Sequence, residues 1–142
     1  MATSAYRADI TLNEVLRGTA TPHLWLHVGA PGAAGTGNPA RRGGDTQNVI
    51  RKAIPDFDAP ENHPTNDERR CLGSGANITW DGTEIDSGQD ITHFSIWDGD
   101  DASTPDVEFI AAVTDSPRHV GSDGVVITPA EIEAAIEVFA KP

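Results

Sequence analysis

The chain has 142 residues, a length that suits one domain with a substantial hydrophobic core. Hydrophobic residues make up 37% and charged residues 23%, so the composition is that of a folded, rather polar protein and excludes general disorder. The 22 acidic and 10 basic residues give a net charge of −12, which repels a phosphate backbone, and we therefore predict no nucleic-acid partner.

The cysteine count and the hydropathy of the chain exclude further classes. Cys71 is the sole cysteine, so neither an internal disulfide nor a cysteine-rich zinc site can form. No apolar run approaches the roughly 20 residues that a membrane-spanning helix needs, and the first residues do not resemble a secretory signal. We expect a soluble protein without membrane insertion.

Residues 1–20 are predicted to form a short helical arm. The stretch 11–14 (TLNE) has the capping-box pattern, in which a threonine and a glutamate satisfy free backbone N–H groups at a helix start. Gly18 is a natural helix end. A helix that begins as early as Ser4 fits the same pattern. Its apolar face would be formed by Leu12, Val15 and Leu16.

A strand and two long loops follow the arm. From Pro22 to Val28, apolar residues alternate with polar or aromatic ones, which is the two-residue period of a strand. Residues 29–45 are rich in Gly and Pro and are predicted to form a flexible loop. Residues 46–54 read as a further strand, and the polar, proline-broken segment 55–70 reads as a second long loop.

The second half of the chain is strand-like. Turn signals such as Asp81-Gly82 and Ser87-Gly88 separate the strand-like runs, and no helices alternate with them. This spacing predicts a mainly β fold, an antiparallel β-sandwich or a barrel-like single domain spanning residues 1–142. The runs are 76–80, 91–97, 107–113, 124–128 and 134–140.

The last of these runs is ambiguous. Residues 128–140 carry a capping-box pattern and apolar residues at helical spacing, so local propensity favours a helix. The alternative is a turn at Pro129-Ala130 followed by a strand with Ile136 and Val138 on one face.

No catalytic or metal-binding constellation emerges from the sequence. His23 and His27 have a zinc-type spacing, but on a strand they would stand about 13 Å apart. Cys71 follows Arg69 and Arg70, which would lower its pKa, yet no histidine partner lies near in sequence. No nucleophile elbow or phosphate-binding loop is present. We predict no catalytic residue, no metal and no cofactor, and therefore no enzyme.

An acidic run and three tryptophans leave alternatives open. Asp98, Asp100, Asp101 and Asp106 are interpreted as a solvated acidic loop, with a bound cation as the alternative. Each tryptophan sits on or at the end of a predicted strand, where packing is the commoner role than ligand binding. These tryptophans are Trp25, Trp80 and Trp97.

The chain resembles small structural proteins of tailed bacteriophages that are described as tail fibre or minor tail proteins. The most distinctive segment is 91–98 (ITHFSIWD), in which Phe94 and Ile96 share one face of a strand with both faces covered. The other similar segments, in the same order and spacing, are 24–32 (LWLHVGAPG), 77–80 (NITW) and 124–130 (GVVITPA).

The resemblance implies a non-enzymatic virion component, made in the host cytoplasm and placed at the tail tip or in a fibre. Its partners would be other virion structural proteins, homo-oligomers and trimers in particular are common in such places, and the protein would take part in assembly and host attachment. The resemblance also implies that 134–140 is a strand. A capsid decoration protein on the head is an alternative from the virion class, and a carbohydrate-binding module that recognises a host surface glycan is an alternative outside it.

Candidate contact residues follow from these hypotheses. The helical arm has an apolar face but too little chain to bury it alone, and the two long loops carry arginines on an anionic protein. A glycan would stack on exposed tryptophans. The interaction candidates are Leu12, Val15, Leu16, Arg41, Arg42, Arg69, Arg70, Trp25 and Trp80.

Overall fold

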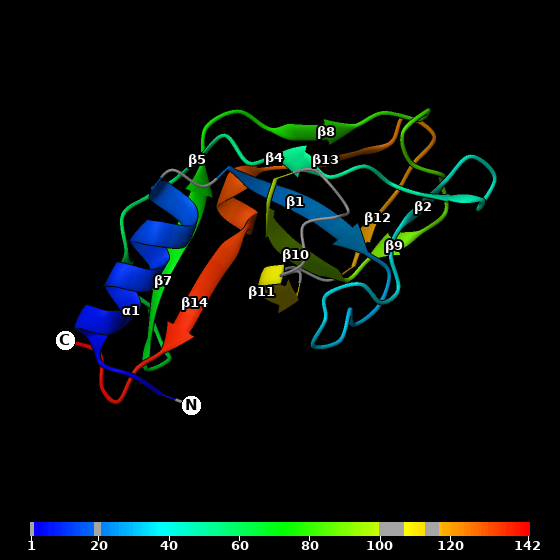
Figure 1. The fold of residues 1–142 in the computed structure, drawn as a ribbon. Helices are drawn as coiled ribbons and strands as arrows, with labels where there is room; N and C mark the ends of the chain where they lie inside the picture. Colours follow the sequence, from blue (N-terminus) through cyan, green and yellow to red (C-terminus); the bar gives the residue numbers. More distant parts are fainter. Residues whose placement is uncertain (1, 19–20, 100–106, 113–116) are drawn as a thin grey trace.

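Antiparallel sheets and one short N-terminal helix make up the molecule (Figure 1). The computed structural model describes residues 2–18, 21–99, 107–112 and 117–142. Among the described residues strands far outnumber helices, which confirms the mainly β prediction. The barrel-like alternative is not seen, because the described strands form separate sheets that do not close.

The first sheet is built around two largely buried strands, β1 (Pro22–His27) and β10 (His93–Asp98). Its order is β11 (Val107–Ala112), β10 (His93–Asp98), β1 (Pro22–His27) and β4 (Lys52–Ala53). The register places Leu24 opposite Ile96. Both faces of β1 and β10 are covered over most of their length, as the sequence predicted for the second of them.

The second sheet lies beside the helix at the other end of the molecule (Figure 1). Its central strand β7 (Glu68–Ser74) pairs with β14 (Glu133–Glu137) on one side. On the other side it pairs in succession with β5 (Asp56–Phe57) and β6 (Glu61–Asn62). Helix α1 (Ala5–Leu12) contacts both β7 and β14 and so covers one face of this sheet.

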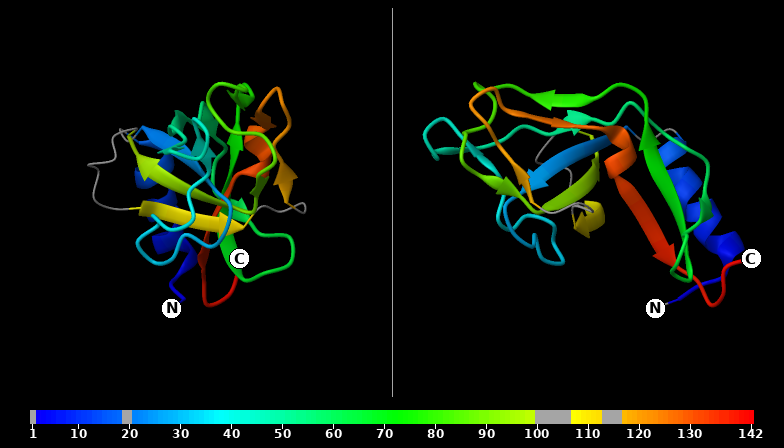
Figure 2. Two further views of the ribbon diagram at one scale, coloured as in Figure 1. Left: turned by 90° about the vertical axis from the view of Figure 1, so that its right-hand side faces the viewer. Right: turned by 180° about the vertical axis from the view of Figure 1, so that it is seen from behind.

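Three two-stranded ladders complete the fold (Figure 2). The turns expected at Asp81-Gly82 and Ser87-Gly88 lie in the connection between two of these ladders. The β2–β3 hairpin lies at the end of the molecule opposite α1 and the chain termini (Figure 1). The ladders are β8 (Ile78–Trp80) with β13 (Val125–Ile127), β9 (Asp90–Ile91) with β12 (Arg118–His119), and β2 (Arg41–Arg42) with β3 (Gln47–Asn48).

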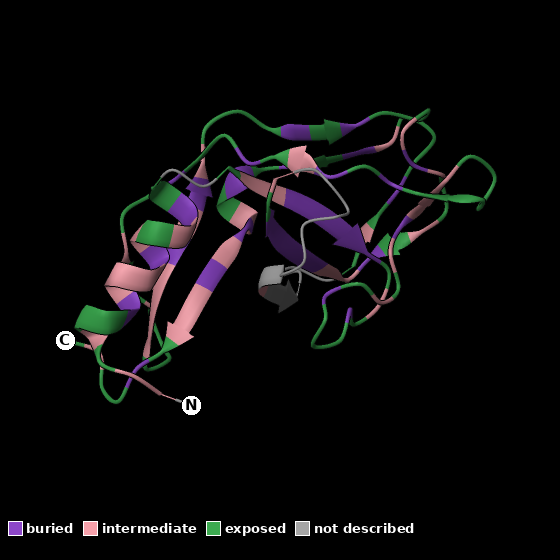
Figure 3. Ribbon diagram, viewed as in Figure 1, coloured by how far each residue is buried: buried purple, intermediate pink, exposed green. Residues whose placement is uncertain are grey.

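One cluster of buried hydrophobic side chains connects the helix to both sheets (Figure 3). Leu12 and Leu16 enter it from the helical arm, and Trp80 enters it from the β8–β13 ladder. Trp80 and Trp97 are its largest fully buried side chains, and burial of such rings contributes strongly to stability. No helix in the described ranges is long and apolar enough to cross a membrane.

The helical arm begins at Ser4, whose hydroxyl accepts a hydrogen bond from the N–H of Arg7. A π-helical turn, η1 (Asn13–Arg17), continues it to Gly18. The stretch 11–14 is therefore inside the helical segment and is not a cap. There the hydroxyl of Thr11 donates to the carbonyl of Arg7, one turn back.

Several predicted boundaries were wrong. The strand expected at 46–54 is two short pieces, β3 and β4, and the long loop expected at 55–70 contains β5, β6 and the start of β7. The glycine-rich loop folds back on β1, because the N–H of Gly37 donates to Pro31 and the N–H of Val28 donates to Asn38. Residue 113, the last of the run expected at 107–113, lies outside the described residues.

The C-terminal segment is a strand, in agreement with the bacteriophage resemblance and against its local helical pattern. A single 3-10 turn, η2 (Pro129–Glu131), uses the predicted cap: the carboxylate of Glu131 accepts from the hydroxyl of Thr128 at 2.6 Å. The chain then pairs with β7 as β14. Pairing and burial of alternate residues outweigh local propensity here.

Candidate functional site

The most reactive-looking side chains meet between β1 and β10. The register of these strands brings His27 beside Ser95, with 2.6 Å between Nε2 and Oγ. Nδ1 of the same ring lies 2.8 Å from the carbonyl of Gly37. Because a carbonyl can only accept, Nδ1 carries the proton and Ser95 donates to Nε2. The indole N–H of Trp97 donates to the serine oxygen at 2.8 Å.

Because the cluster is buried, a substrate cannot reach it. A serine that donates to a histidine is the arrangement of a nucleophile and its base. Both side chains are fully buried, and the serine oxygen already accepts from Trp97. Burial also lowers the pKa of His27 to about 4, so the ring is neutral near pH 7. The cluster satisfies polar groups inside the core.

The tryptophans lie inside the protein, as their packing interpretation predicted, and are not platforms for a ligand. Trp25 packs edge-on against Trp97 with ring centroids 6.1 Å apart, and its indole N–H donates to Val49. The guanidinium of Arg51 lies over both rings, 4.0 Å from that of Trp97. Trp80 is fully buried and donates to Ile50. Neither Trp25 nor Trp80 can offer a ring face to a sugar.

Five further candidates make contacts within the chain and are not available to a partner. Arg69 contacts the carboxylate of Asp9 on α1 with two nitrogens, at 2.8 and 3.0 Å. Arg70 bridges Glu61 at 3.0 Å and Glu133 at 2.6 Å, which ties β6 to β14. The apolar face of the helical arm is equally occupied. Leu12 and Leu16 belong to the core, and Val15 packs against it.

The remaining two candidates, Arg41 and Arg42, lie on the β2–β3 hairpin. The side chain of Arg41 is 36% exposed and lies 3.5 Å from the carboxylate of Asp45. Arg42 donates to the backbone carbonyl of Asn48. The carboxylate of Asp86 accepts from the N–H of Asp45 at 2.8 Å and so fixes the hairpin tip. These contacts hold two cationic side chains at the surface of the molecule.

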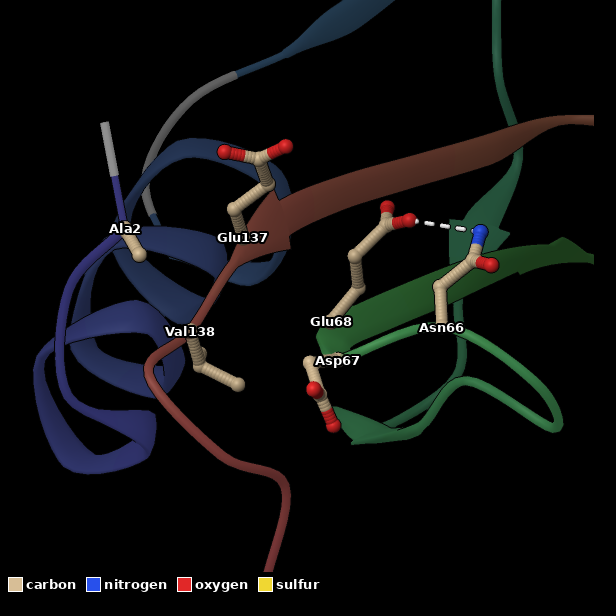
Figure 4. Close-up of a pocket in the computed structure, with 6 residues that line it drawn as sticks. All are labelled: Ala2, Asn66, Asp67, Glu68, Glu137 and Val138. Carbon is tan, nitrogen blue, oxygen red and sulfur yellow. Dashed lines mark hydrogen bonds between the residues drawn. The ribbon is translucent and has the colours of Figure 1, made fainter.

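Sequence reasoning missed a pocket at the opposite end of the molecule (Figure 4). Its volume is about 420 Å³. The pocket forms where β7 and β14 pair. Because the sequence predicted no strand at β7, it could not predict that these two segments lie side by side. The lining residues are Ala2, Asn66, Asp67, Glu68, Glu137 and Val138.

Neither a metal site nor a reactive thiol is present among the described residues. No group of three or more metal-ligating side chains occurs within the described ranges. Asp98 accepts from the N–H of Thr21, while Asp100, Asp101 and Asp106 of the acidic loop lie outside these ranges. Burial raises the pKa of Cys71 to about 11, because it outweighs the lowering effect of Arg69 that the sequence suggested.

Comparison with protein families gives a match over most of the chain. A family model described as podophage GP4 fiber I protein gp80 matches residues 2–134. No curated protein matches the chain. The matched range includes α1, both strands of the buried histidine cluster and the start of β14.

Proposed function

The chain belongs to the podophage GP4 fiber I protein family, and from that premise we propose that it is a non-enzymatic structural component of the phage tail, in a fibre or at the tail tip. The family indicates a bacteriophage fibre protein located in the virion. The match over residues 2–134 is the observation that carries the proposal, because it covers nearly the whole chain.

The buried histidine cluster supports a role without catalysis. Its serine and histidine have the contacts of a catalytic pair but no access for a substrate. Cys71 is likewise buried, and its raised pKa keeps it a thiol at neutral pH. The buried polar side chains therefore stabilise the fold, which is the role expected in a structural protein.

Assembly and host attachment are the two tasks that we propose for this building block. Its partners are other virion structural proteins. Further copies of the chain are among them, and a homotrimer is the first oligomeric state to test. The β2–β3 hairpin with Arg41 and Arg42 is our candidate for contact, because it projects at the end opposite the termini (Figure 1). Arginine forks pair well with carboxylates across interfaces.

Electron microscopy of purified particles tests the location. Particles that carry the chain with a small epitope tag are labelled with gold-coupled antibody, and copies per particle are counted by quantitative mass spectrometry. We expect a handful of copies and label at the tail. Hundreds of copies with label on the head would replace this proposal with capsid decoration, and absence from particles would refute both.

Adsorption measurements test the attachment role. The purified chain is added in excess to host cells before the phage. We expect slower phage adsorption if the chain itself contacts the host surface, and unchanged adsorption would limit its role to assembly. Native mass measurement of the same preparation reports the number of copies that associate.

A further inference from the structure

The tip of the β2–β3 hairpin is a left-handed turn at the end of the molecule opposite the termini (Figure 1). Gly43, Gly44 and Asp45 have φ values of 64°, 70° and 68°. The N–H of Thr46 donates to the carbonyl of Arg42 at 3.2 Å and closes the turn. Glycine adopts this conformation readily, whereas an aspartate is strained in it. Backbone strain of this kind persists only where neighbouring groups hold it, and it clusters at functional surfaces.

The segment between β8 and β9 holds the hairpin in this shape. The carboxylate of Asp86 accepts from the N–H of Asp45 at 2.8 Å and from that of Gly44 at 3.4 Å. The side-chain amide of Gln89 accepts from the N–H of Arg41 and donates to the carbonyl of the same residue, both at 2.8 Å. The N–H of Asp86 donates to that carbonyl as well. These bonds fix a hairpin whose tip is exposed throughout.

The two arginines of the hairpin differ in what they can still bind. In Arg41 the two terminal nitrogens donate to the side chain of Asn48 at 2.6 Å and to the carbonyl of Asp45 at 3.2 Å. Its Nε lies 3.5 Å from the carboxylate of Asp45. Arg42 donates through Nε to the carbonyl of Asn48 at 3.0 Å, and its terminal nitrogens have no partner among the described residues. Arg41 therefore supports the turn, while Arg42 can bind a further group.

Arg42 shares one face of the hairpin with Gln47. The two residues are directly opposite in the register, and side chains alternate along a strand, so Arg41 and Asn48 lie on the other face. Gln47 is exposed, and its side-chain amide has no partner within the part of the chain that the structure describes. A guanidinium fork beside an amide can donate several hydrogen bonds to one acidic group.

We propose that this face, formed by Arg42 and Gln47, docks an acidic segment of a neighbouring virion protein, with the guanidinium fork bound to a carboxylate. That the neighbour is a virion protein rests on the proposed function. Charge complementarity argues for a carboxylate, because the fork has no acidic partner in the described chain although acidic residues outnumber basic ones by 22 to 10. Arg69, Arg70 and Arg118, in contrast, each bind a carboxylate of their own chain.

A phosphate group and a second copy of the chain fit this face less well. A phosphate carries a second negative charge, so the exposed carboxylate of Asp45 at the hairpin tip repels it more strongly than it repels a carboxylate. A second copy would bring together two chains of net charge −12, which opposes association. The neighbour needs only a local acidic segment, whatever its overall charge.

An NMR titration of the full purified chain with a synthetic peptide of alternating glutamate and serine tests the recognition. We expect the peptide to shift the backbone amide signals of Arg42 and Gln47, and Arg42→Gln to bind it at least about fivefold more weakly. Arg42→Lys keeps the charge without the fork and should retain only part of the affinity. Arg7→Gln removes the same charge from the exposed surface of α1 and should change the affinity by less than about twofold.

Asp86→Ala separates the order of the hairpin from its charge. The substitution removes a negative charge near the arginines, so electrostatics alone would strengthen the binding of an acidic peptide. Loss of the bonds to Gly44 and Asp45 should weaken binding instead, by about threefold, because the hairpin must then be ordered when the peptide binds. Hydrogen exchange at these two amides should become faster. Tighter binding, or exchange at the native rate, would refute the positioning role of Asp86.

Incorporation into particles connects this contact to the virion. Arg42→Gln should be incorporated at a fraction of the native level and Arg7→Gln at the native level, and thermal unfolding verifies that each variant is folded. Normal incorporation of Arg42→Gln would refute this inference alone. Absence of the native chain from particles would refute the proposed function, whatever the peptide shows.

The other outcomes of the titration also decide against the proposal. It is overturned if the native chain does not bind the peptide, or if Arg42→Gln and Arg7→Gln lose the same affinity. Inorganic phosphate is the second probe, and tighter binding of phosphate than of the peptide would assign the face to a different anion. Self-association that Arg42→Gln abolishes would assign it to a second copy.

Discussion

At the scale of single residues, Ser95 links the two other side chains of the buried histidine cluster. Its oxygen accepts from the indole of Trp97, and its hydroxyl donates to His27. Ser95→Ala would leave a buried indole N–H and a ring nitrogen without partners, which we expect to lower the free energy of unfolding by about 1–3 kcal/mol. Urea denaturation measures this, with the exposed Ser122→Ala as control. Equal stability of both variants would show that the cluster contributes little.

His27 makes the stability depend on pH. Its pKa is about 4 in the folded chain and 6.5 when unfolded, because burial disfavours the charged ring. The unfolded chain therefore binds more protons between these values. The full stabilisation is present above about pH 6.5 and is lost as the pH falls towards 4, a difference of about 3 kcal/mol.

A variant isolates this contribution from that of the carboxylates. His27→Gln should be less stable than the native chain at pH 7 but should lose less stability on going to pH 4.5. Urea denaturation at both values measures the difference. His23→Gln on the same strand is the matched control, since its ring is only half-buried. Identical pH slopes for the native chain and His27→Gln would contradict the prediction.

At the scale of elements, the strands that the sequence predicted are the ones with clear alternation. The alternation of side chains in β10 and the turn residues near β8 are local features of the sequence, so the structure matches what they predict. β7 was missed because Glu68, Arg69 and Arg70 look like a polar loop. Only the tertiary structure supplies their partners: Asp9 on the helix and Glu133 on β14. A polar strand with distant ion-pair partners has no local signal.

A close approach of η2 to β7 gives a prediction at the same scale. A Cβ added to Gly73 would lie 2.5 Å from the carbonyl oxygen of Pro129, and that backbone atom cannot move without shifting η2. We expect Gly73→Ala to cost about 1–3 kcal/mol of stability. Gly121→Ala is the control, because a Cβ there meets nothing within 4 Å. The idea fails if both variants melt at the same temperature.

At the scale of the whole molecule, the contact candidates predicted from the sequence divide by position. Leu12, Leu16, Trp25 and Trp80 looked available because a sequence cannot show which faces meet, and a single core takes all four. Arg41 and Arg42 remain at the surface, on the β2–β3 hairpin at the end of the molecule opposite the termini (Figure 1). The bacteriophage resemblance indicated the class of protein. The position of the hairpin at one end of the molecule could be seen only in the structure.

The hairpin end carries the final prediction. Arg41→Glu with Arg42→Glu reverses two charges whose side-chain hydrogen bonds lie within the β2–β3 hairpin, so the core and both sheets should be unaffected. We expect this variant to fold normally and to be incorporated into particles at a fraction of the native level, because repulsion replaces arginine–carboxylate pairing with a neighbour. Thermal unfolding and quantitative mass spectrometry of purified particles measure the two effects.

A charge reversal at the opposite end makes this result specific. Arg7→Glu, exposed on α1, is the control and should be incorporated normally. Normal incorporation of the hairpin variant would remove Arg41 and Arg42 from the contact surface, and unfolding would show that the hairpin supports the fold. If the hairpin variant is lost from particles while Arg7→Glu is retained, the contact with the neighbour belongs to the hairpin end of the molecule, because a charge reversal of the same sign at the other end has no effect.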